Sequence, residues 1–414
     1  MTDRRQILVV GGGAAGFFAA ITAAEALGEA GHVTIAETTL HPLAKVRISG
    51  GGRCNVTNAC ADPREFVSFY PRGGRELLGP LTRFGNRETI EWFHSRGVEL
   101  RAQPDGRLFP VTDSSATIID CLQGAARDAG VTLRTRCGVR DVVRNPAGGF
   151  AASLTTGESL TVDRVLIATG GAREANTGGC ALAASLGHTI VPPVPSLFGF
   201  CIRDARLDGL AGLAFEKVET RLPGTSLRTE GAMLFTHEGM SGPAILKLSA
   251  WGARELAARD YRFTFAVNFA PPLTEEQAAA QLTALRHTHG RKQLATWNPL
   301  GLQQRLWERL VVAAGVRPDV TWATAPAETV RALARQVTAA EFAVHGKSTN
   351  KDEFVTCGGV ALREVDFRTM ESRICPGLFF AGEVLDIDGL TGGFNFQAAW
   401  TTGWHAGKST ASTP

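Results

Sequence analysis

The stretch that decides the fold lies close to the N-terminus and reads Gln6-Ile7-Leu8-Val9-Val10-Gly11-Gly12-Gly13-Ala14-Ala15-Gly16. The short, β-branched run 6–10 is typical of a buried parallel strand. The glycines satisfy G-x-G-x-x-G, an alanine-rich segment to about Leu27 predicts a helix, and a second apolar run, 32–36, ends in Glu37. Strand, glycine turn, helix, strand and terminal acid in this order predict a Rossmann-type α/β domain that binds a dinucleotide.

Each position of this motif has a physical task. Gly11 allows the tight turn from strand to helix, Gly13 lets the backbone approach a pyrophosphate, and Gly16 lets the helix pack closely on the strand. The first residues of the helix offer free N–H groups and a partial positive charge to the phosphates. Glu37 follows Gly16 by 21 residues and is placed to accept hydrogen bonds from an adenosine ribose. The motif by itself fits NAD and FAD equally.

A second glycine-rich segment is Ser49-Gly50-Gly51-Gly52-Arg53-Cys54-Asn55. Polar donors flank the glycine triplet, and consecutive unhindered backbone N–H groups suit a contact with phosphate or with the edge of a flavin ring. The alternative is an ordinary glycine loop. Arg53 is expected to balance pyrophosphate or substrate charge. Lys45 and Arg47 have the same expected role, with a solvated surface position as the alternative.

Three later segments favour FAD over NAD. An apolar strand, 165–168, ends at Thr169-Gly170-Gly171, and the run 377–382 repeats the strand-then-glycine pattern before Glu383. Glu383 can bind the ribityl chain or the pyrophosphate, where many flavoproteins have Asp. Residues 392–395 then precede a helix that extends to about Gly407. The N-terminus of this helix would stabilise negative charge on a reduced flavin.

Both ends of the chain are therefore expected to supply ligands to one FAD. The residues expected to contact it are Gly11, Gly13, Ala14, Ala15, Gly16, Glu37, Lys45, Ser49, Gly51, Gly52, Arg53, Asn55, Thr169, Gly170, Gly171, Gly382, Glu383, Gly392, Gly393, Phe394 and Asn395.

The combination of segments 49–55, 235–243, 382–389 and 392–395 resembles one bacterial family. This is the BaiN-like group of FAD-dependent oxidoreductases, which includes aminoacetone-oxidase-like members. The resemblance spans nearly the whole chain. It implies a glutathione-reductase-type Rossmann FAD domain with an inserted antiparallel β domain and a small helical domain. The activities reported for the family include reduction of conjugated C=C bonds and of uridine in large-subunit ribosomal RNA.

Composition changes predict the domain boundaries. A proline-rich stretch, 191–195, marks a departure from the first domain, and short β-prone runs alternate with turns until about Pro272. Thr274 and Gln277 form a capping-box signal before three helical stretches. We expect an FAD-binding domain of residues 1–193 and 355–414, a β domain of residues 194–273 and 338–354, and a helical domain of residues 274–337.

Two side chains are candidates for the proton donor that a flavin reduction needs. Cys54 lies in the glycine loop, and its alternative role is a small packing residue. His237 lies in a loop-like run, and its alternative role is to hold that turn. The chain has no second G-x-G-x-x-G unit. NAD(P)H, as the expected reductant, would therefore dock over the flavin and leave before the substrate enters.

Charge and composition narrow the function classes. The net charge of +3 predicts no nucleic-acid partner by itself. Residues 40–140 hold 15 Lys/Arg against 10 Asp/Glu, and residues 291–351 hold 9 against 4. Solvated faces account for both excesses, and a polyanionic substrate is the alternative interpretation. The eight cysteines form no CxxC pair, so we expect no metal site.

Short apolar runs and a polar N-terminus lead us to expect a cytoplasmic protein without a membrane span.

Three functions compete at this level. The first is an NAD(P)H-driven reductase of an activated C=C bond, with uridine in large-subunit ribosomal RNA as the specific case. The second is an amine or aminoketone oxidase that releases hydrogen peroxide. The third is a flavin-binding module without turnover. A small molecule or ribosomal RNA is accordingly the expected substrate.

Overall fold

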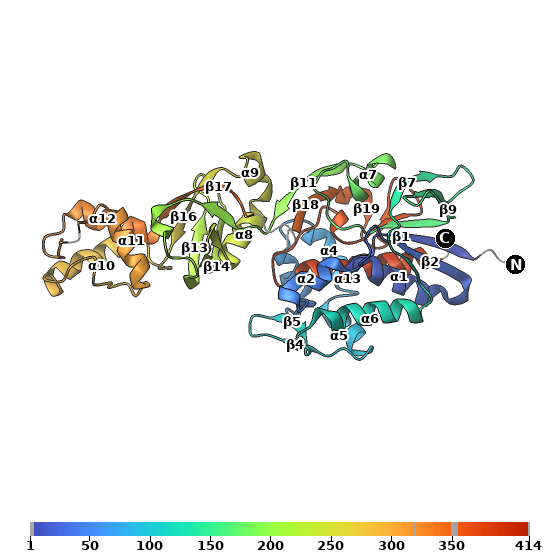
Figure 1. The fold of residues 1–414 in the computed structure, drawn as a ribbon, viewed down its shortest axis with the longest axis horizontal. Helices are drawn as coiled ribbons and strands as arrows, with labels where there is room; N and C mark the ends of the chain where they lie inside the picture. Colours follow the sequence, from blue (N-terminus) through green and yellow to red (C-terminus); the bar gives the residue numbers. More distant parts are fainter. Residues whose placement is uncertain (1–3, 318, 349–354, 413–414) are drawn as a thin grey trace. The chain divides into compact units, whose positions relative to one another are not determined.

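The computed structural model describes residues 4–317, 319–348 and 355–412. The chain divides into two compact units (Figure 1). The first unit contains Met1–Ser196 and Asn350–Pro414, and the second contains Leu197–Thr349. The first unit is thus built from the two ends of the chain.

A seven-stranded sheet forms the centre of the first unit. Its strands, in spatial order, are β19 (Val365–Asp366), β20 (Glu371–Ser372), β21 (Leu378–Phe380), β10 (Arg164–Ile167), β1 (Arg5–Val10), β2 (Gly31–Ala36) and β6 (Thr132–Arg134). The five strands from β21 to β6 are parallel, and β19 and β20 add an antiparallel edge. Because the C-terminal strand β21 pairs with β10, and β10 pairs with β1, both chain ends meet in one sheet. The predicted α/β class is confirmed.

Helices α1 (Ala14–Leu27) and α13 (Phe394–Ala411) join the two ends a second time. Residues 15–24 of α1 are all buried, as expected for a helix that is apolar on every side. The two helices pack against each other along their length. The other helices of this unit are α2 (Ala44–Gly52), α3 (Pro63–Phe66), α4 (Gly74–Leu81), α5 (Asn86–His94), α6 (Ser115–Asp128) and α7 (Gly178–Ser185).

Three small antiparallel sheets complete the first unit. They are β3 (Thr57–Asn58) with β5 (Arg107–Pro110) and β4 (Leu100–Ala102), β7 (Val139–Arg144) with β8 (Phe150–Leu154) and β9 (Ser159–Val162), and β11 (Ile190–Ser196) with β18 (Val355–Val360). Strand β11 is the last element before the second unit and β18 the first described one after it. Their pairing, with Ile190 opposite Val360, ties the exit of the chain to its return.

The second unit contains a closed barrel whose neighbouring strands are antiparallel. In spatial order these are β12 (Phe200–Ile202), β15 (Gly239–Ser241), β14 (Arg228–Phe235), β13 (Ala214–Arg221), β16 (Phe263–Asn268) and β17 (Ala340–Lys347). Buried aromatic rings fill the barrel, with Phe200 in edge-to-face contact with both Phe263 and Phe265. Helices α8 (Pro243–Trp251) and α9 (Ala253–Ala258) lie between β15 and β16 in the sequence.

Three helices separate β16 from β17 in the sequence: α10 (Glu275–Thr288), α11 (Gln304–Ala313) and α12 (Ala327–Thr338). The predicted capping box at the start of α10 is confirmed. Thr274 Oγ1 accepts a hydrogen bond from Gln277 N at 3.2 Å, and Gln277 Oε1 accepts one from Thr274 N at 3.0 Å. Within the described part of the chain, no helix has the length and apolar character that a membrane crossing requires.

Candidate functional site

The turn between β1 and α1 leaves room only for glycine at two of its positions. Gly11 has a φ of 109°, and a Cβ there would lie 2.6 Å from the carbonyl oxygen of Ala168. A Cβ at Gly16 would lie 2.0 Å from the carbonyl oxygen of Gly11. By contrast, no described atom lies within 4 Å of a Cβ placed at Gly13, the N-cap of α1. The N-terminus of α1 therefore faces open space, which suits an approaching phosphate.

Glu37, at the end of β2, is held against this turn. Its Oε2 accepts a hydrogen bond from Gly12 N at 2.7 Å, and its Oε1 accepts bonds from the Thr39 backbone and hydroxyl, also at 2.7 Å. A carboxylate offers about four acceptor positions. The three bonds fix the side chain and leave it about one position for a ribose hydroxyl, as the sequence motif predicts.

The glycine triplet forms an open turn at the end of α2. Gly50, Gly51 and Gly52 all have left-handed φ angles, of 57°, 69° and 83°, and so does Cys54 at 61°. No described atom lies within 4 Å of a Cβ at Gly51 or Gly52, and both residues are exposed. Their backbone therefore presents itself to solvent without hindrance, as a phosphate- or flavin-binding loop requires.

The basic residues of this segment have different surroundings. Lys45 Nζ lies 2.6 Å from Glu383 Oε2, so two predicted cofactor ligands from opposite ends of the chain form an ion pair. The Arg53 guanidinium lies over the ring of Phe109, 4.2 Å from its centroid, with Nη1 3.8 Å from Asp113 Oδ1. Arg47 is exposed, which agrees with its alternative role as a surface residue.

Glu383 connects four segments of the first unit. Its Oε1 accepts a hydrogen bond from Thr356 N in β18 at 2.8 Å, while its Oε2 contacts Lys45 of α2. A Cβ at Gly171 would lie 2.9 Å from Glu383 Oε1 and 2.1 Å from Thr356 Oγ1. The segment after β10 can thus run past Glu383 only because residue 171 is glycine.

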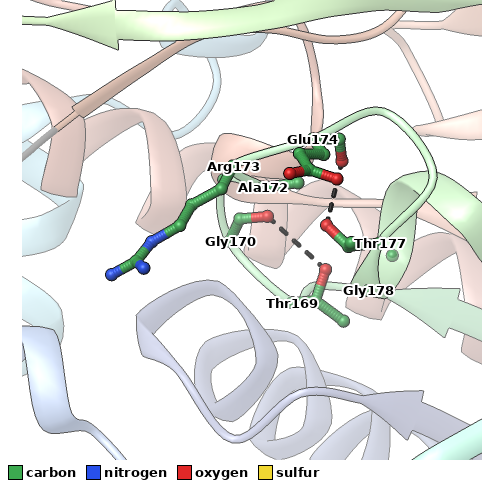
Figure 2. A pocket seen from close by; sticks show the side chains of 9 residues that line it. Thr169, Gly170, Ala172, Arg173, Glu174, Thr177 and Gly178 are labelled. Atoms are coloured by element: carbon green, nitrogen blue, oxygen red, sulfur yellow. Dashed lines mark hydrogen bonds between the residues drawn. The ribbon is translucent and has the colours of Figure 1, made fainter.

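A cavity of about 360 Å³ opens beside this point (Figure 2). It is lined by the loop from the end of β10 to the start of α7: Thr169, Gly170, Gly171, Ala172, Arg173, Glu174, Thr177, Gly178 and Gly179. The loop is braced by a hydrogen bond from Thr177 Oγ1 to the Glu174 carbonyl at 2.9 Å. In Figure 2 the side chain of Arg173 extends away from Glu174 and Thr177. The residues predicted from the sequence ended at Gly171 and did not include Arg173, a cation two residues after the glycine pair.

At the N-terminus of α13 the predicted residues divide into two kinds. Gly392 and Gly393 have φ angles of 130° and 94°, and a Cβ at Gly393 would lie 2.4 Å from the carbonyl carbon and oxygen of Thr57. Asn55, with its amide oriented to suit its neighbours, accepts a hydrogen bond from Gly393 N at 2.9 Å. The glycine loop and α13 are therefore joined directly.

The side chains of Phe394 and Asn395 point into protein contacts. Phe394 is buried and stacks on Phe69 at a centroid distance of 4.4 Å. The Asn395 side chain exchanges two 2.8 Å hydrogen bonds with the backbone of Gly389. Both arrangements indicate that these side chains position the start of α13, so a cofactor contact would involve their backbone.

Sequence reasoning missed a buried ion pair just before α13. Arg72 donates two hydrogen bonds to the carboxylate of Asp388, which is 0% exposed, and Ser196 Oγ donates another at 2.7 Å. Burial raises the pKa of Asp388, while the Arg72 guanidinium opposes that rise. A buried carboxylate needs such partners to stay charged. The pair fixes the segment that leads into α13.

The two candidate proton donors lie in different units. Cys54 is completely buried, and burial raises the pKa of its thiol to about 12, against a weaker opposing hydrogen bond with Ser49. A general acid works best with a pKa near the working pH. The burial of Cys54 therefore favours its packing role. His237 is exposed in the turn between β14 and β15 of the second unit. Both catalytic roles stay predictions.

The geometry of the first unit defines a class of protein. A helix N-terminus in open space, a fixed carboxylate at the end of β2 and an open glycine loop joined to α13 form a cradle along one parallel sheet. At Gly13, Gly51 and Gly52 a Cβ would occupy this open space without touching any described atom. The cradle fits the pyrophosphate and ring of FAD, and the class is that of Rossmann-type FAD-dependent oxidoreductases.

Comparison with known proteins identifies the family. The model of the HI0933-like protein Rossmann domain matches residues 5–409, and the chain belongs to this family. This confirms the resemblance inferred from the motifs.

Curated relatives match nearly the full length of the chain. The ribosomal RNA dihydrouridine synthase of Escherichia coli K12 is 32% identical over 411 residues, covering 97% of each chain. The 3-dehydro-bile acid delta(4,6)-reductase of Clostridium scindens is 31% identical over 420 residues, covering 99% of this chain and all of the relative. Among solved structures, the fold resembles 3-ketosteroid-delta4-(5alpha)-dehydrogenase from Rhodococcus jostii RHA1. That likeness has a TM-score of 0.52 and 17% identity, covering 99% of this chain and 97% of that one.

Proposed function

We propose that the protein is an NAD(P)H-driven reductase of an activated C=C bond, and that its substrate is uridine in large-subunit ribosomal RNA. The observation that carries this proposal is the 32% identity to a ribosomal RNA dihydrouridine synthase over 97% of both chains. Dihydrouridine is uridine with its C5=C6 bond saturated, so that activity is a reduction. With this substrate the enzyme would act in the cytoplasm.

The 31% identity to a bile acid reductase supports reduction as the reaction class. It gives less support to ribosomal RNA as the substrate. Two relatives of almost equal similarity have names that describe reductions of very different molecules. Function depends on the substrate pocket more than on the fold. The electron-transfer part of the site is therefore expected to be shared, and the substrate-binding part to differ.

The residues proposed to hold FAD are those of the cradle. The N-terminus of α1 would bind the pyrophosphate, Glu37 the ribose, and the Gly51–Gly52 backbone and the Lys45–Glu383 pair the middle of the cofactor. The bound flavin supplies hydride transfer. The partial positive charge at the N-terminus of α13, which begins at Phe394, would stabilise negative charge that develops nearby.

The chain has one G-x-G-x-x-G unit, so NAD(P)H and substrate are proposed to use the same face of the cofactor in turn. Arg173 lines the cavity of the first unit, and its cation is proposed to attract a charged ligand there. For the proton, the burial of Cys54 counts against its thiol, and the exposed His237 stays a candidate.

The test combines a genetic and a biochemical arm. Deletion of the gene should remove a dihydrouridine from large-subunit ribosomal RNA, and the wild-type gene should restore it, as measured by nucleoside mass spectrometry. In the second arm the purified protein is incubated anaerobically with NADPH and unmodified ribosomal RNA transcript, or with a 3-oxo-4,6-diene bile acid.

Dihydrouridine formed with the transcript alone would support the proposal. Turnover of the steroid alone would retain the reductase and replace its substrate. A flavin that neither NADH nor NADPH reduces in stopped-flow mixing would refute the proposed reductant. Peroxide release on mixing with an amine in air would instead indicate the oxidase.

A further inference from the structure

The loop between α10 and α11 gathers cations and aromatic rings in the second unit. From 277 to 307 the sequence contains no Asp or Glu, but it contains Arg286, Arg291, Lys292 and Arg305. Two histidines and two tryptophans occur in the same stretch. A stretch of this length without any acid concentrates positive charge, which a net charge of +3 for the whole chain conceals.

The rings of this loop form an ordered cluster. His289 stacks on Trp297 with a centroid distance of 4.2 Å and an interplanar angle of 23°. Lys292 Nζ lies 4.5 Å from the centroid of Trp297. Trp297 in turn meets the buried Trp322 edge to face at 6.3 Å, so the cluster is anchored in the core of the helices. His289 and Trp297 are half-buried, and Lys292 and its neighbour Arg291 are exposed.

Hydrogen bonds to backbone carbonyls account for two cations of the stretch, whereas Arg291 and Lys292 have no acidic partner among the described residues and Lys292 lies over the ring of Trp297. Arg286 donates to the carbonyl of Ala325, and Arg305 donates to the carbonyl of Gly209, so both hold segments together. Arg286 also lies in the last turn of α10, where the helix dipole favours a cation. Arg291 and Lys292 lie beyond that helix. Neither forms an ion pair with any acidic residue that the structure describes.

We propose that Arg291, Lys292 and the His289–Trp297 stack form a binding surface for RNA. We call these four residues the α10–α11 cluster. This inference rests on the proposed function and deepens it, because it locates the surface where the enzyme binds its ribosomal RNA substrate. Unpaired cations bind phosphates, and neighbouring flat rings provide stacking surfaces for unpaired bases. Rings that are already stacked and anchored lose little further freedom when RNA binds.

The test compares two double variants that remove the same charge from the same unit. Arg291→Gln with Lys292→Gln alters the cluster. Lys217→Gln with Arg228→Gln is the matched control, because both of these exposed cations are paired with acids, Glu230 and Glu219, each at 2.8 Å. Binding of unmodified large-subunit ribosomal RNA transcript to the flavin-loaded enzyme is measured by filter binding between 50 and 300 mM salt. Reduction of the flavin by NADPH is recorded for each protein to show that the site is intact.

We expect the cluster variant to bind RNA on the order of 10-fold more weakly at 100 mM salt, and its salt slope to fall by about 1 to 2. The control should keep the wild-type Kd and slope within about twofold. If both variants bind RNA like the wild type, or if both lose RNA affinity equally, the cluster is not the RNA surface. Dihydrouridine formation by the wild-type enzyme would still support the proposed function in that case. If the wild-type enzyme neither binds nor modifies the transcript, the proposed function fails and this inference fails with it.

Discussion

Substitution by Ala should affect different properties at two glycines of the first turn. Gly16→Ala places a methyl group 2.0 Å from the Gly11 carbonyl oxygen, well inside the roughly 3 Å that such atoms tolerate, and that oxygen belongs to rigid backbone. Gly13→Ala, three residues earlier, places the methyl group where no described atom lies within 4 Å. The first variant should therefore damage the fold, and the second should affect only a ligand in the open space.

The structure sets the expected size of each effect. Overpacking against backbone costs about 1–3 kcal/mol or more, and the better helix propensity of Ala recovers at most about 1 kcal/mol. Flavin-free Gly16→Ala protein should thus melt several degrees below the wild type, at about 2–4 °C for each kcal/mol. Flavin-free Gly13→Ala protein loses only the preference of the N-cap for Gly over Ala, about 0.5–1 kcal/mol, and should melt within a few degrees of the wild type. Its Kd for FAD should rise about tenfold or more, equivalent to about 1.4 kcal/mol.

Thermal unfolding of the flavin-free proteins and a fluorescence titration with FAD measure these two quantities separately. If Gly13→Ala binds FAD with wild-type affinity, the phosphates do not approach α1 at this position, and the proposed cradle is wrong. If Gly16→Ala melts like the wild type, the close approach at Gly11 is absorbed by the backbone, and the reasoning from the 2.0 Å contact fails.

Three further predictions concern the first unit. Arg72→Ala should lower the free energy of unfolding by about 3–5 kcal/mol in urea, because it leaves the buried Asp388 carboxylate uncompensated. Arg101→Ala, at the exposed pair with Asp113, should cost less than about 1 kcal/mol. Equal losses would contradict the role of burial. Burial lowers the pKa of His405 from 6.5, so below that pH the unfolded state binds more protons than the folded state. The free energy of unfolding should therefore be fully retained above pH 6.5 and should fall below it. In His405→Gln protein this fall should be less steep. Cys54→Ala should keep its turnover within about twofold at saturating FAD, because a thiol with a pKa of about 12 does not exchange protons near neutrality; a loss of 100-fold or more would make it the acid.

The parts of the site that could be predicted from the sequence are those that local geometry dictates. The requirement for glycine at 11 and 16 follows from one turn, and the capping box of Thr274 follows from four consecutive residues. The Arg72–Asp388 pair joins positions 316 residues apart, and no local sequence pattern predicts it. The burial of Cys54 likewise depends on tertiary packing around its side chain. Whether a polar residue near a ligand touches it or supports the backbone, as Asn395 does, is a property of tertiary packing.

The spacing of two glycines in α13 is a sequence feature that indicates close packing between the two ends of the chain. Gly403 and Gly407 are four residues apart and therefore lie on one face of α13. A Cβ at Gly403 would lie 2.7 Å from the carbonyl oxygen of Ala15, and one at Gly407 would lie 2.5 Å from that of Ala19, so this face packs directly against the backbone of α1. Helix α1, which begins at the first glycine turn, and helix α13, which begins beside the glycine loop, thus approach as closely as backbones allow. Because we propose that the turns before both helices bind the cofactor, the spacing of two glycines near the C-terminus is expected to help set the geometry of a site whose best-known motif lies at the N-terminus.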